Sequence, residues 1–524
     1  MRVSTSQIYN IATLGMSQAQ AAIVKTEEQI ATGKRVLSPA DDPVAAANIL
    51  QLNQDLARTE QYKKNIDIAD NSLSLEETNL KSIDDLMQRM REQAVKAGNT
   101  AVLTSADYKS LAAEVDTRIA ELMNLQNTRN SSGQYIFAGY QGDTKPFVNN
   151  GGGNYSYMGD EGQLRLQASA SVSVAVSDSG KKLFVDIPSG HNTINTSASS
   201  TNRALPAAII SVGEVIDQEA FDKFYPEDMV ITFNAPSAAA VPPAANYTVT
   251  ERSTGKVLVA NATYVKGEAI EVKGISLNIS GSPVAPTPAS LPFNFDAAAA
   301  PIDFSVTPAS FKVTVNGRTE TLTVNTPVNN AADFATALNS PPNNTKLSNL
   351  GLTATAAGIV SENGENIKLH SGNANLNNAT GLATNTGVTS TNGVTGDSFF
   401  VESTNKQGLL TTLSRFSEAM KAVKDTPESK AVLADIIAKT LTNLSNSITN
   451  ISSAQGEVGA RQNTLESSKD LNLDVVLFSK QTLSNLESLD VAEATIRLSM
   501  QSLVLTASQQ GFAKVSQLTL FSYL

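Results

Sequence analysis

Two segments of this 524-residue chain, one near each end, carry apolar residues at the alternating three- and four-residue spacing of packed helices. The clearer stripe lies in the C-terminal part and consists of Ile437, Leu441, Leu444, Ile448, Ile451, Gln455, Val458, Gln462 and Leu465. The isolated amides Gln455 and Gln462 are typical of polar core positions that fix the register of a helix pair. We interpret the stripe as a packing seam and not as a catalytic site.

The N-terminal part predicts a second long helix, from about Val44 to Ala97. Two heptad registers run through it, one with Ile66, Leu73, Leu80 and Met87 and the other with Ala69, Glu76, Ile83 and Met90. At 1.5 Å per residue the helix would be roughly 80 Å long. The preceding LSPADDP sequence signals a helix start, because Asp41 or Asp42 can cap the free amides and Pro43 suits the first helical position. Capping explains the adjacent aspartates better than a metal or acid–base site, which would need further ligands nearby.

Further helical patterns cover Thr5–Thr32, the region through Leu111 and Leu125, Gln407–Lys424, and a last stretch from about Leu483 to Leu524. The two outermost patterns are thin, with Ile8, Ile11, Ile23 and Ile30 in the first and Leu498, Leu505, Phe512 and Val515 in the last. Burying roughly ten such side chains returns less free energy than the backbone entropy of ordering about forty residues costs. We therefore expect both ends to be disordered until they fold against partners.

After Asn130 the sequence changes to strand-like patterns. Pieces with strand propensity recur at 164–176, 230–233, 247–250 and 275–279. A Pro/Ala-rich stretch at 283–301 predicts a linker between two β subdomains. Beyond it, Asn316-Gly317 predicts a hairpin turn, and a ββαββ-like module follows from the strand-like pieces 311–315, 321–324, 352–356 and 367–370 around a short helix near 331–339.

Together these patterns predict an α+β fold, in which N- and C-terminal segments form one long helical bundle or coiled coil and the β-rich middle is inserted between them. The predicted domains are terminal helical segments at 1–40 and 485–524, a helical rod at 41–150 and 405–484, and β-rich domains at 151–282 and 302–404.

Composition narrows the possible functions. Hydrophobic residues make up 41% of the chain, yet no uncharged apolar run is long enough to span a bilayer, so we expect a soluble protein. The first thirty residues lack the pattern of a cleaved signal peptide. There is no cysteine, and two lone histidines, His191 and His370, leave little for zinc or acid–base chemistry. A net charge of −11 argues against nucleic acid as a partner. We predict no enzyme activity, cofactor or metal.

Three sequence motifs resemble a known family. LSPADDP at 37–43, YIFAG at 135–139 followed by Pro146-Phe147, and the end from Asp490 to LTLFSYL at 518–524 resemble the flagellar hook-associated proteins of type 3, the hook–filament junction proteins of the flagellin superfamily. Residues 304–371 resemble the small insertion module of flagellins and hook proteins. The resemblance covers roughly the first 150 and the last 120 residues.

The resemblance implies an extracellular subunit of the bacterial flagellum, exported by the flagellar type III apparatus without a cleaved signal peptide. It would form a ring of copies between the first hook-associated protein and flagellin, with an export chaperone bound before secretion. The alternative is a flagellin filament subunit, and a more distant one is a surface-displayed binding module at 150–400. An aromatic content of 5% without tryptophan weakens the second alternative, because sugar sites usually need aromatic platforms.

Two sets of residues follow from this interpretation. The predicted assembly interface consists of Ile8, Ile11, Ile23, Ile30, Asp41, Asp42, Leu498, Leu505, Phe512 and Val515. The predicted seam within the chain consists of Ile66, Leu73, Leu80, Met87, Ile437, Leu441, Leu444, Ile448, Ile451, Val458 and Leu465.

Overall fold

The computed structural model describes residues 5–237, 244–293, 302–371, 388–389 and 393–517. It is an α+β structure, as predicted, and divides into two compact units. Unit 1 comprises Met1–Leu75, Leu164–Val176 and Glu457–Leu524, and unit 2 comprises Glu76–Gln163 and Ser177–Gly456. The division falls inside the two longest helices, α2 (Pro43–Ala97) and α9 (Pro427–Glu487), and not at the predicted boundaries near residues 40 and 485.

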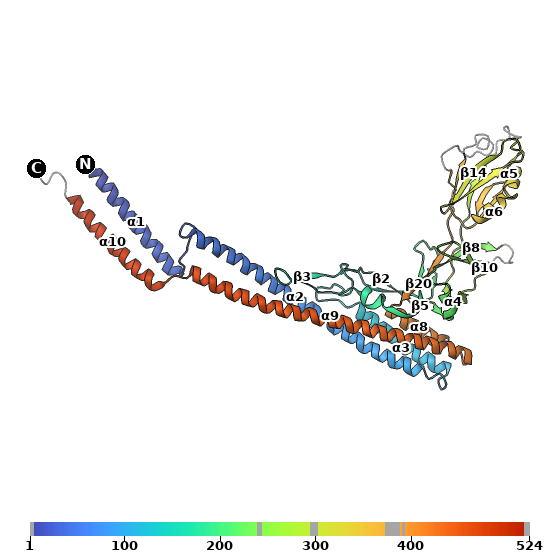
Figure 1. Cartoon of the computed structure of the whole chain (residues 1–524), viewed down its shortest axis with the longest axis horizontal. Coiled ribbons are helices and arrows are strands. Elements are labelled where there is room, and N and C mark those ends of the chain that lie inside the picture. Colours follow the sequence, from blue (N-terminus) through green and yellow to red (C-terminus); the bar gives the residue numbers. More distant parts are fainter. Residues whose placement is uncertain (1–4, 238–243, 294–301, 372–387, 390–392, 518–524) are drawn as a thin grey trace. The chain divides into compact units, whose positions relative to one another are not determined.

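Unit 1 is built almost entirely from helices. It holds α1 (Thr5–Thr32), whose bounds match the prediction, α10 (Val491–Gln517), the first part of α2 and the last part of α9 (Figure 1). Within this unit α2 and α9 lie side by side and antiparallel. Lys469 forms an ion pair with Asp67 at 3.1 Å, and Gln462 donates a hydrogen bond to Ser74 at 3.4 Å.

A short β-hairpin covers this helix pair. Its strands are β3 (Arg165–Gln167) and β4 (Ser173–Ala175). Asn65 of α2 donates to the backbone oxygen of Gln167 at 2.9 Å, and Asn472 of α9 donates to that of Ala168 at 2.8 Å. The sequence predicted 164–176 as part of a β-rich domain over 151–282. This part of the prediction is wrong, because the asparagines bind the hairpin backbone to the helices and it belongs to unit 1.

The seam on α9 has one register that the sequence predicted and one that it did not. The first is buried, with Ile437, Leu444, Ile451, Val458 and Leu465. In the second, the predicted Leu441, Ile448, Gln455 and Gln462 are only half-buried, and the fully buried positions lie one residue earlier at Thr440, Ser447 and Ala454. The hydroxyls of Thr440 and Ser447 donate to backbone oxygens four residues back, those of Ile436 and Asn443. Such hydroxyls need no partner from another helix, so small side chains can line a close contact.

The matching stripe on α2 is buried along its length. Ile66, Leu73, Leu80 and Met87 are all at most 2% exposed. The second register of α2, with Ala69, Glu76, Ile83 and Met90, is equally buried. Both heptad registers of this helix were therefore predicted.

In unit 2 the helices are covered by further layers. Helices α3 (Ser105–Gln126) and α8 (Leu409–Ala422) pack against each other. The largest sheet has the order β10-β9-β8-β20-β5 and is antiparallel, with β5 (Pro188–Ala198), β8 (Met229–Ser237), β9 (Ala244–Glu251), β10 (Val257–Thr263) and β20 (Ser398–Lys406). Its core contains Phe233 packed edge-to-face on Phe399 and Tyr264.

Smaller elements complete this region. They are β1 (Phe147–Gly151), β2 (Asn154–Tyr157), β6 (Ile209–Ile210), β7 (Glu214–Val215), β11 (Ala269–Val272), β12 (Ile275–Ser280), the short α4 (Gln218–Asp222) and a π-helical turn over Lys181–Val185. The predicted strands at 230–233, 247–250 and 275–279 lie in β8, β9 and β12 and are confirmed.

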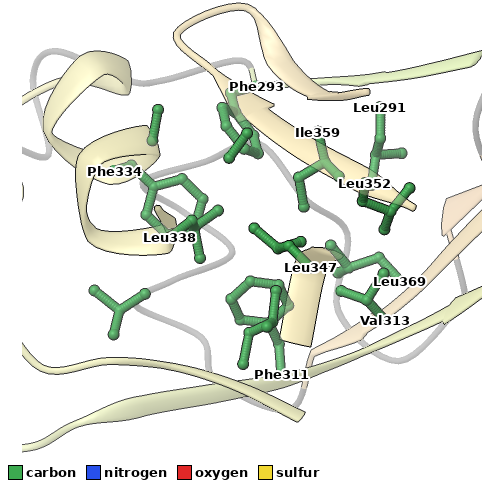
Figure 2. Close-up of a cluster of buried hydrophobic side chains, with 14 of the residues drawn as sticks. Leu291, Phe293, Phe311, Val313, Phe334, Leu338, Leu347, Leu352, Ile359 and Leu369 are labelled. Atoms are coloured by element: carbon green, nitrogen blue, oxygen red, sulfur yellow. The ribbon is translucent and has the colours of Figure 1, made fainter. Parts of the chain in front are cut away.

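A separate hydrophobic core lies in the insertion module. The module contains β13 (Ala289–Pro292), β14 (Ala309–Val315), β15 (Arg318–Val324), α5 (Ala331–Leu338), α6 (Asn343–Asn349), β16 (Leu352–Thr355), β17 (Gly358–Ser361), β18 (Ile367–Ser371) and β19 (Val388–Thr389). Figure 2 shows Phe334 of α5 beside Phe311 of β14, with ring centroids 6.2 Å apart. The Asn316-Gly317 turn is confirmed, since both residues adopt positive φ between β14 and β15.

The predicted linker at 283–301 is wrong in part. Residues 289–292 form β13, which pairs with β17; Ala289 is buried, and Leu291 belongs to the module core. Alternation of these residues with Ser290 and Pro292 is a strand pattern, but the Pro/Ala-rich composition concealed it. Proline is tolerated because β13 is an edge strand of its three-stranded sheet.

The loop between α1 and α2 holds the terminal helices to the rest of unit 1. The backbone N–H of Arg35 donates to Glu487 at 2.7 Å, and that of Leu489 donates to Gly33 at 3.0 Å, so this loop pairs with the α9–α10 connection. Asp42 caps α2 by accepting from the Ala45 N–H at 2.9 Å. Asp41 closes the loop. The predicted capping is thus confirmed, with Asp42 as the cap.

Asp41 accepts hydrogen bonds from the backbone N–H groups of Leu37 and Ser38, at 3.0 and 2.9 Å, and forms an ion pair with Lys25 of α1. The hydrogen bond with Lys25 and then that from Ser38 lower the pKa of Asp41 from 3.8 to about 2. Its loop interactions therefore require the ionised carboxylate.

We predict that Ser447→Leu destabilises unit 2 by about 1–3 kcal/mol, because the larger side chain must enter a filled seam. Thr449→Leu, at an exposed position two residues away, should change the free energy of unfolding by less than about 0.5 kcal/mol. Urea unfolding followed by far-ultraviolet circular dichroism measures both. Equal tolerance of the two leucines would show that Ser447 is not part of the seam.

We predict that the 33–42 loop opens in acid. Because the folded-state pKa of Asp41 is depressed, its stabilising contribution is present above the ordinary value of 3.8 and is lost as the pH falls toward about 2. Hydrogen exchange of the Arg35 and Leu489 amides, corrected for intrinsic rates, should accelerate over this range. In Asp41→Asn, which keeps an acceptor oxygen but not the charge, exchange should already be faster at neutral pH and less pH-dependent. An unchanged acid profile in Asp41→Asn would contradict this assignment.

Candidate assembly surface

Helices α1 and α10 form an antiparallel pair in unit 1 (Figure 1). Their less exposed positions follow heptad spacing, with Tyr9, Ala12, Met16, Ala19, Ile23, Thr26 and Ile30 on α1 and Ala494, Leu498, Gln501, Leu505, Ser508 and Phe512 on α10. Tyr9 meets Phe512 edge-to-face at a centroid distance of 5.3 Å, and Thr26 donates to the side-chain oxygen of Gln501 at 2.9 Å. Many of these inner positions are small or polar, so the pair buries little apolar surface.

The outward faces of the same two helices are rich in large apolar side chains. Ile496 is 72% exposed and Ile11 is 65% exposed. The other strongly exposed apolar side chains are Leu14 and Val24 on α1 and Val491, Met500, Leu503 and Val504 on α10. A shallow groove between the helices is lined by Ala19, Ile496, Met500 and Val504 together with Glu493, Arg497 and Gln501. A helix that is apolar on all sides is normally buried, so this surface is suited to cover by other helices.

The structure places the predicted interface residues on two different faces. Ile11 points outward, whereas Ile23, Ile30, Leu498, Leu505 and Phe512 are partly buried along the α1–α10 contact. The side chains of Ile8 and Val515 lie outside the described residues. Asp41 and Asp42 lie in the loop that holds this pair in place. A single heptad register selected the inner stripe of α10, and the outer stripe with Ile496 and Met500 was missed because it follows the same spacing one face away.

Exposed apolar residues continue along the rest of unit 1. On α9 they are Leu471, Leu473, Val475, Leu477 and Phe478, and on α2 they are Val44, Leu50 and Ile68. Such residues occur singly on ordinary monomer surfaces, but a concentration on four neighbouring helices indicates an interaction surface.

Chemistry other than helix packing finds no support in the described part of the chain. No group of three or more His, Asp or Glu residues there could hold a metal ion. His191 and His370 are both exposed. None of the helices in the described ranges combines the length and apolar character that crossing a membrane requires.

A cavity of about 260 Å³ in unit 2 is lined in part by the buried guanidinium of Arg415 on α8. All five of its N–H groups have acceptors within the unit, namely the backbone oxygens of Gly213, Ile194 and Val212 and the side-chain oxygens of Thr193 and Gln407. Glu214 lies 3.7 Å away, and burial raises the pKa of its carboxyl while Arg415 opposes that shift. Arg415 therefore fastens α8 to the strands and has no donor left for a ligand.

The chain is similar to known bacterial flagellar proteins. Residues 3–142 match the family model of the bacterial flagellin N-terminal helical region. The flagellar hook-associated protein 3 of Escherichia coli is 36% identical over 228 residues, which span 43% of this chain and 70% of that protein. The protein of the same name from Salmonella typhimurium is 36% identical over 189 residues, which span 36% of this chain and 58% of the relative.

Among solved structures, the crystal structure of flagellar hook-associated protein 3 from Legionella pneumophila is 22% identical, with a TM-score of 0.43 over 84% of this chain and 98% of that one. The family assignment depends on the sequence relatives. With an identity of 36% across 70% of the Escherichia coli protein, the chain belongs to the flagellar hook-associated protein 3 family.

Proposed function

We propose that this flagellar structural protein is the adaptor that joins the hook to the filament. Copies of the chain would form a ring, with the first hook-associated protein on one side and flagellin on the other. The observation that carries the proposal is the exposed apolar surface of unit 1, in which α1 and α10 present Ile11, Ile496 and Met500 outward. An adaptor needs such a surface because it is covered on several sides when assembled.

The composition of the α1–α10 contact supports a fold that is completed on assembly. Its inner positions include Ala12, Ala19 and Ser508, which contribute little hydrophobic free energy on burial. The proposal assigns 1–40 and 485–524 to segments that are disordered in the free chain and order between neighbours. The rod at 41–150 and 405–484 would be folded beforehand, and the β-rich regions 151–282, without the β3–β4 hairpin at 164–176, and 302–404 would face solvent. The terminal helices would continue the inner lining of the tube that the hook and the filament form.

The same feature suits export through a narrow channel. Ends that gain little from packing within the chain unfold at small cost, which favours passage by the flagellar type III apparatus. An export chaperone would cover the exposed apolar residues of α10 before secretion, because they would otherwise associate non-specifically. Export and chaperone binding are parts of the proposal, as is the extracellular position in the flagellum.

The family assignment favours the junction role over that of a bulk filament subunit. The chain also carries the YIFAG segment and the terminal Ser-Tyr-Leu that favoured the junction protein in the sequence. A junction subunit would be scarce in sheared filaments, whereas flagellin would be the dominant protein.

Deleting residues 485–524 should leave a soluble chain that cannot seed filament growth, because α10 and its outward face are removed. Electron microscopy of cells carrying only the truncated protein should show hooks without filaments, with flagellin shed into the medium. Complementation with the full chain is the control. Normal filaments on the truncated protein would defeat the junction proposal.

A single charge on the outward face of α10 should have a similar effect. We predict that Met500→Asp greatly reduces the fraction of cells bearing filaments, since it places a carboxylate where a neighbouring helix would pack. Ser499→Asp adds the same charge at the adjacent, polar exposed position and should be tolerated better. Counting filaments per cell while immunoblotting for exported protein separates assembly from export. If the two variants behave alike, the outward apolar stripe is not the assembly surface.

A further inference from the structure

We propose that the end of α9 in unit 1 carries two separate docking flanks and that copies of this chain join head-to-tail, flank A of one copy against flank B of the next. Flank A consists of Leu471, Val475 and Phe478, and flank B consists of Leu473 and Leu477. The proposal rests on the proposed function, because it specifies how the copies in a ring contact one another.

The helical spacing separates the two flanks in direction. At about 100° per residue, the buried residues Asn472, Val476 and Ser479 define the face of α9 that packs within the unit. Flank A then lies about 100° to one side of this face, and flank B lies about 110° to the other side. The flanks therefore look away from each other, and one neighbour cannot cover both.

Both flanks are strongly exposed. Phe478 is 73% exposed and Leu477 is 70% exposed, and the other three side chains are also exposed. A helix that serves only as the outer layer of a monomer has polar residues on these sides. Residues 471–479 contain a single charged residue, Asp474, so little desolvation of charge opposes the docking of a second helix on either side.

The arrangement of the flanks favours a copy of this chain as the occupant, joined without a twofold axis. A twofold contact uses the same patch on both copies and would leave the other flank of each in water. A head-to-tail contact covers both flanks on every copy and continues around a closed ring. Large, flat Phe478 on flank A and the two leucines of flank B also differ in shape, as the two sides of such a contact do.

Charge agrees with self-association through unit 1. This unit contains 13 basic and 15 acidic residues, so the greater part of the net charge of −11 lies in unit 2. Copies that meet through unit 1 experience little mutual repulsion there, whereas contact through the more acidic unit 2 would be opposed.

The absence of cysteine allows an unambiguous cross-linking test. Val475→Cys labels flank A, and Lys480→Cys labels the border of flank B. Five residues rise about 7.5 Å along a helix and these two face different directions, so a double variant cannot form a disulfide within one chain, and a bismaleimide link within one chain would leave the product at monomer size. A short bismaleimide reagent is applied to flagella isolated from cells that express both single variants, and to concentrated purified chains mixed in equal amounts.

The head-to-tail contact predicts dimers from the mixture and none from either single variant alone. The double variant should give a ladder of higher oligomers. Dimers from a single variant alone would indicate a twofold contact and overturn the proposal. So would products joined only to another flagellar protein, or no products in either preparation.

Matched flank variants distinguish a direct contact from chance proximity. Phe478→Ser in the Val475→Cys chain should reduce dimers at least tenfold, and so should Leu477→Ser in the Lys480→Cys chain. As a control, Phe478→Ser is placed in the Lys480→Cys chain and Leu477→Ser in the Val475→Cys chain. Each change then removes a flank that the labelled contact does not use, and dimers should persist. Gln481→Ser, at an exposed position outside both flanks, is the control. If filaments grow but no A-to-B dimers form, the flanks are rejected and the junction function stands. If A-to-B dimers form but filaments also grow without this chain, the flanks stand and the junction function is rejected.

Discussion

The structure depends on the two long helices α2 and α9, and part of the buried face of α9 in unit 2 consists of small hydroxyl side chains. Thr440 and Ser447 occupy alternate positions of the seam and satisfy their hydroxyls on their own helix. Small side chains permit a close contact but contribute little hydrophobic free energy. Additional layers must therefore stabilise the pair wherever they are available.

The two units differ in whether such layers exist. In unit 2 the helices are accompanied by α3, α8 and several sheets, and Arg415 uses every donor to hold α8 against the strands. Among the described residues of unit 1, the β3–β4 hairpin alone covers α2 and α9, and α1 and α10 pack with each other. The apolar residues that would contact further layers are exposed there. The surface available for assembly is thus a consequence of the missing layers.

Polar side chains also determine how the β-region joins α9 in unit 2. Asn443 accepts from the Gly190 N–H at 3.0 Å, Asn446 donates to Pro188 at 2.9 Å and Asn450 donates to Leu183 at 2.9 Å. These bonds connect side chains of a helix to the backbone of β5 and of the π-helical turn before it, so they fix one register without needing an apolar interface. A β-region attached in this way can lie along a side of α9 that is largely polar.

The kind of interaction that forms a feature determines whether that feature could be predicted from the sequence. Helix α1, the start of α2 and the Asn316-Gly317 turn depend on local periodicity, capping and backbone conformation, so the residues themselves predicted them. The register through Ser447 could not be found from apolar spacing, because serine is buried there by virtue of a bond to its own helix. The strand β13 was hidden by its proline and alanine content.

The candidate surface was only half predictable for a related reason. Periodicity identifies a stripe, but it cannot say whether that stripe faces the same chain or another one. Leu498 and Met500 lie two residues apart on α10, and the first is partly buried against α1 while the second is exposed. Only the position of α1 separates the two roles. A helix with apolar residues on several faces therefore indicates assembly as a property of the whole helix, and the three-dimensional structure is needed to assign each face to its partner.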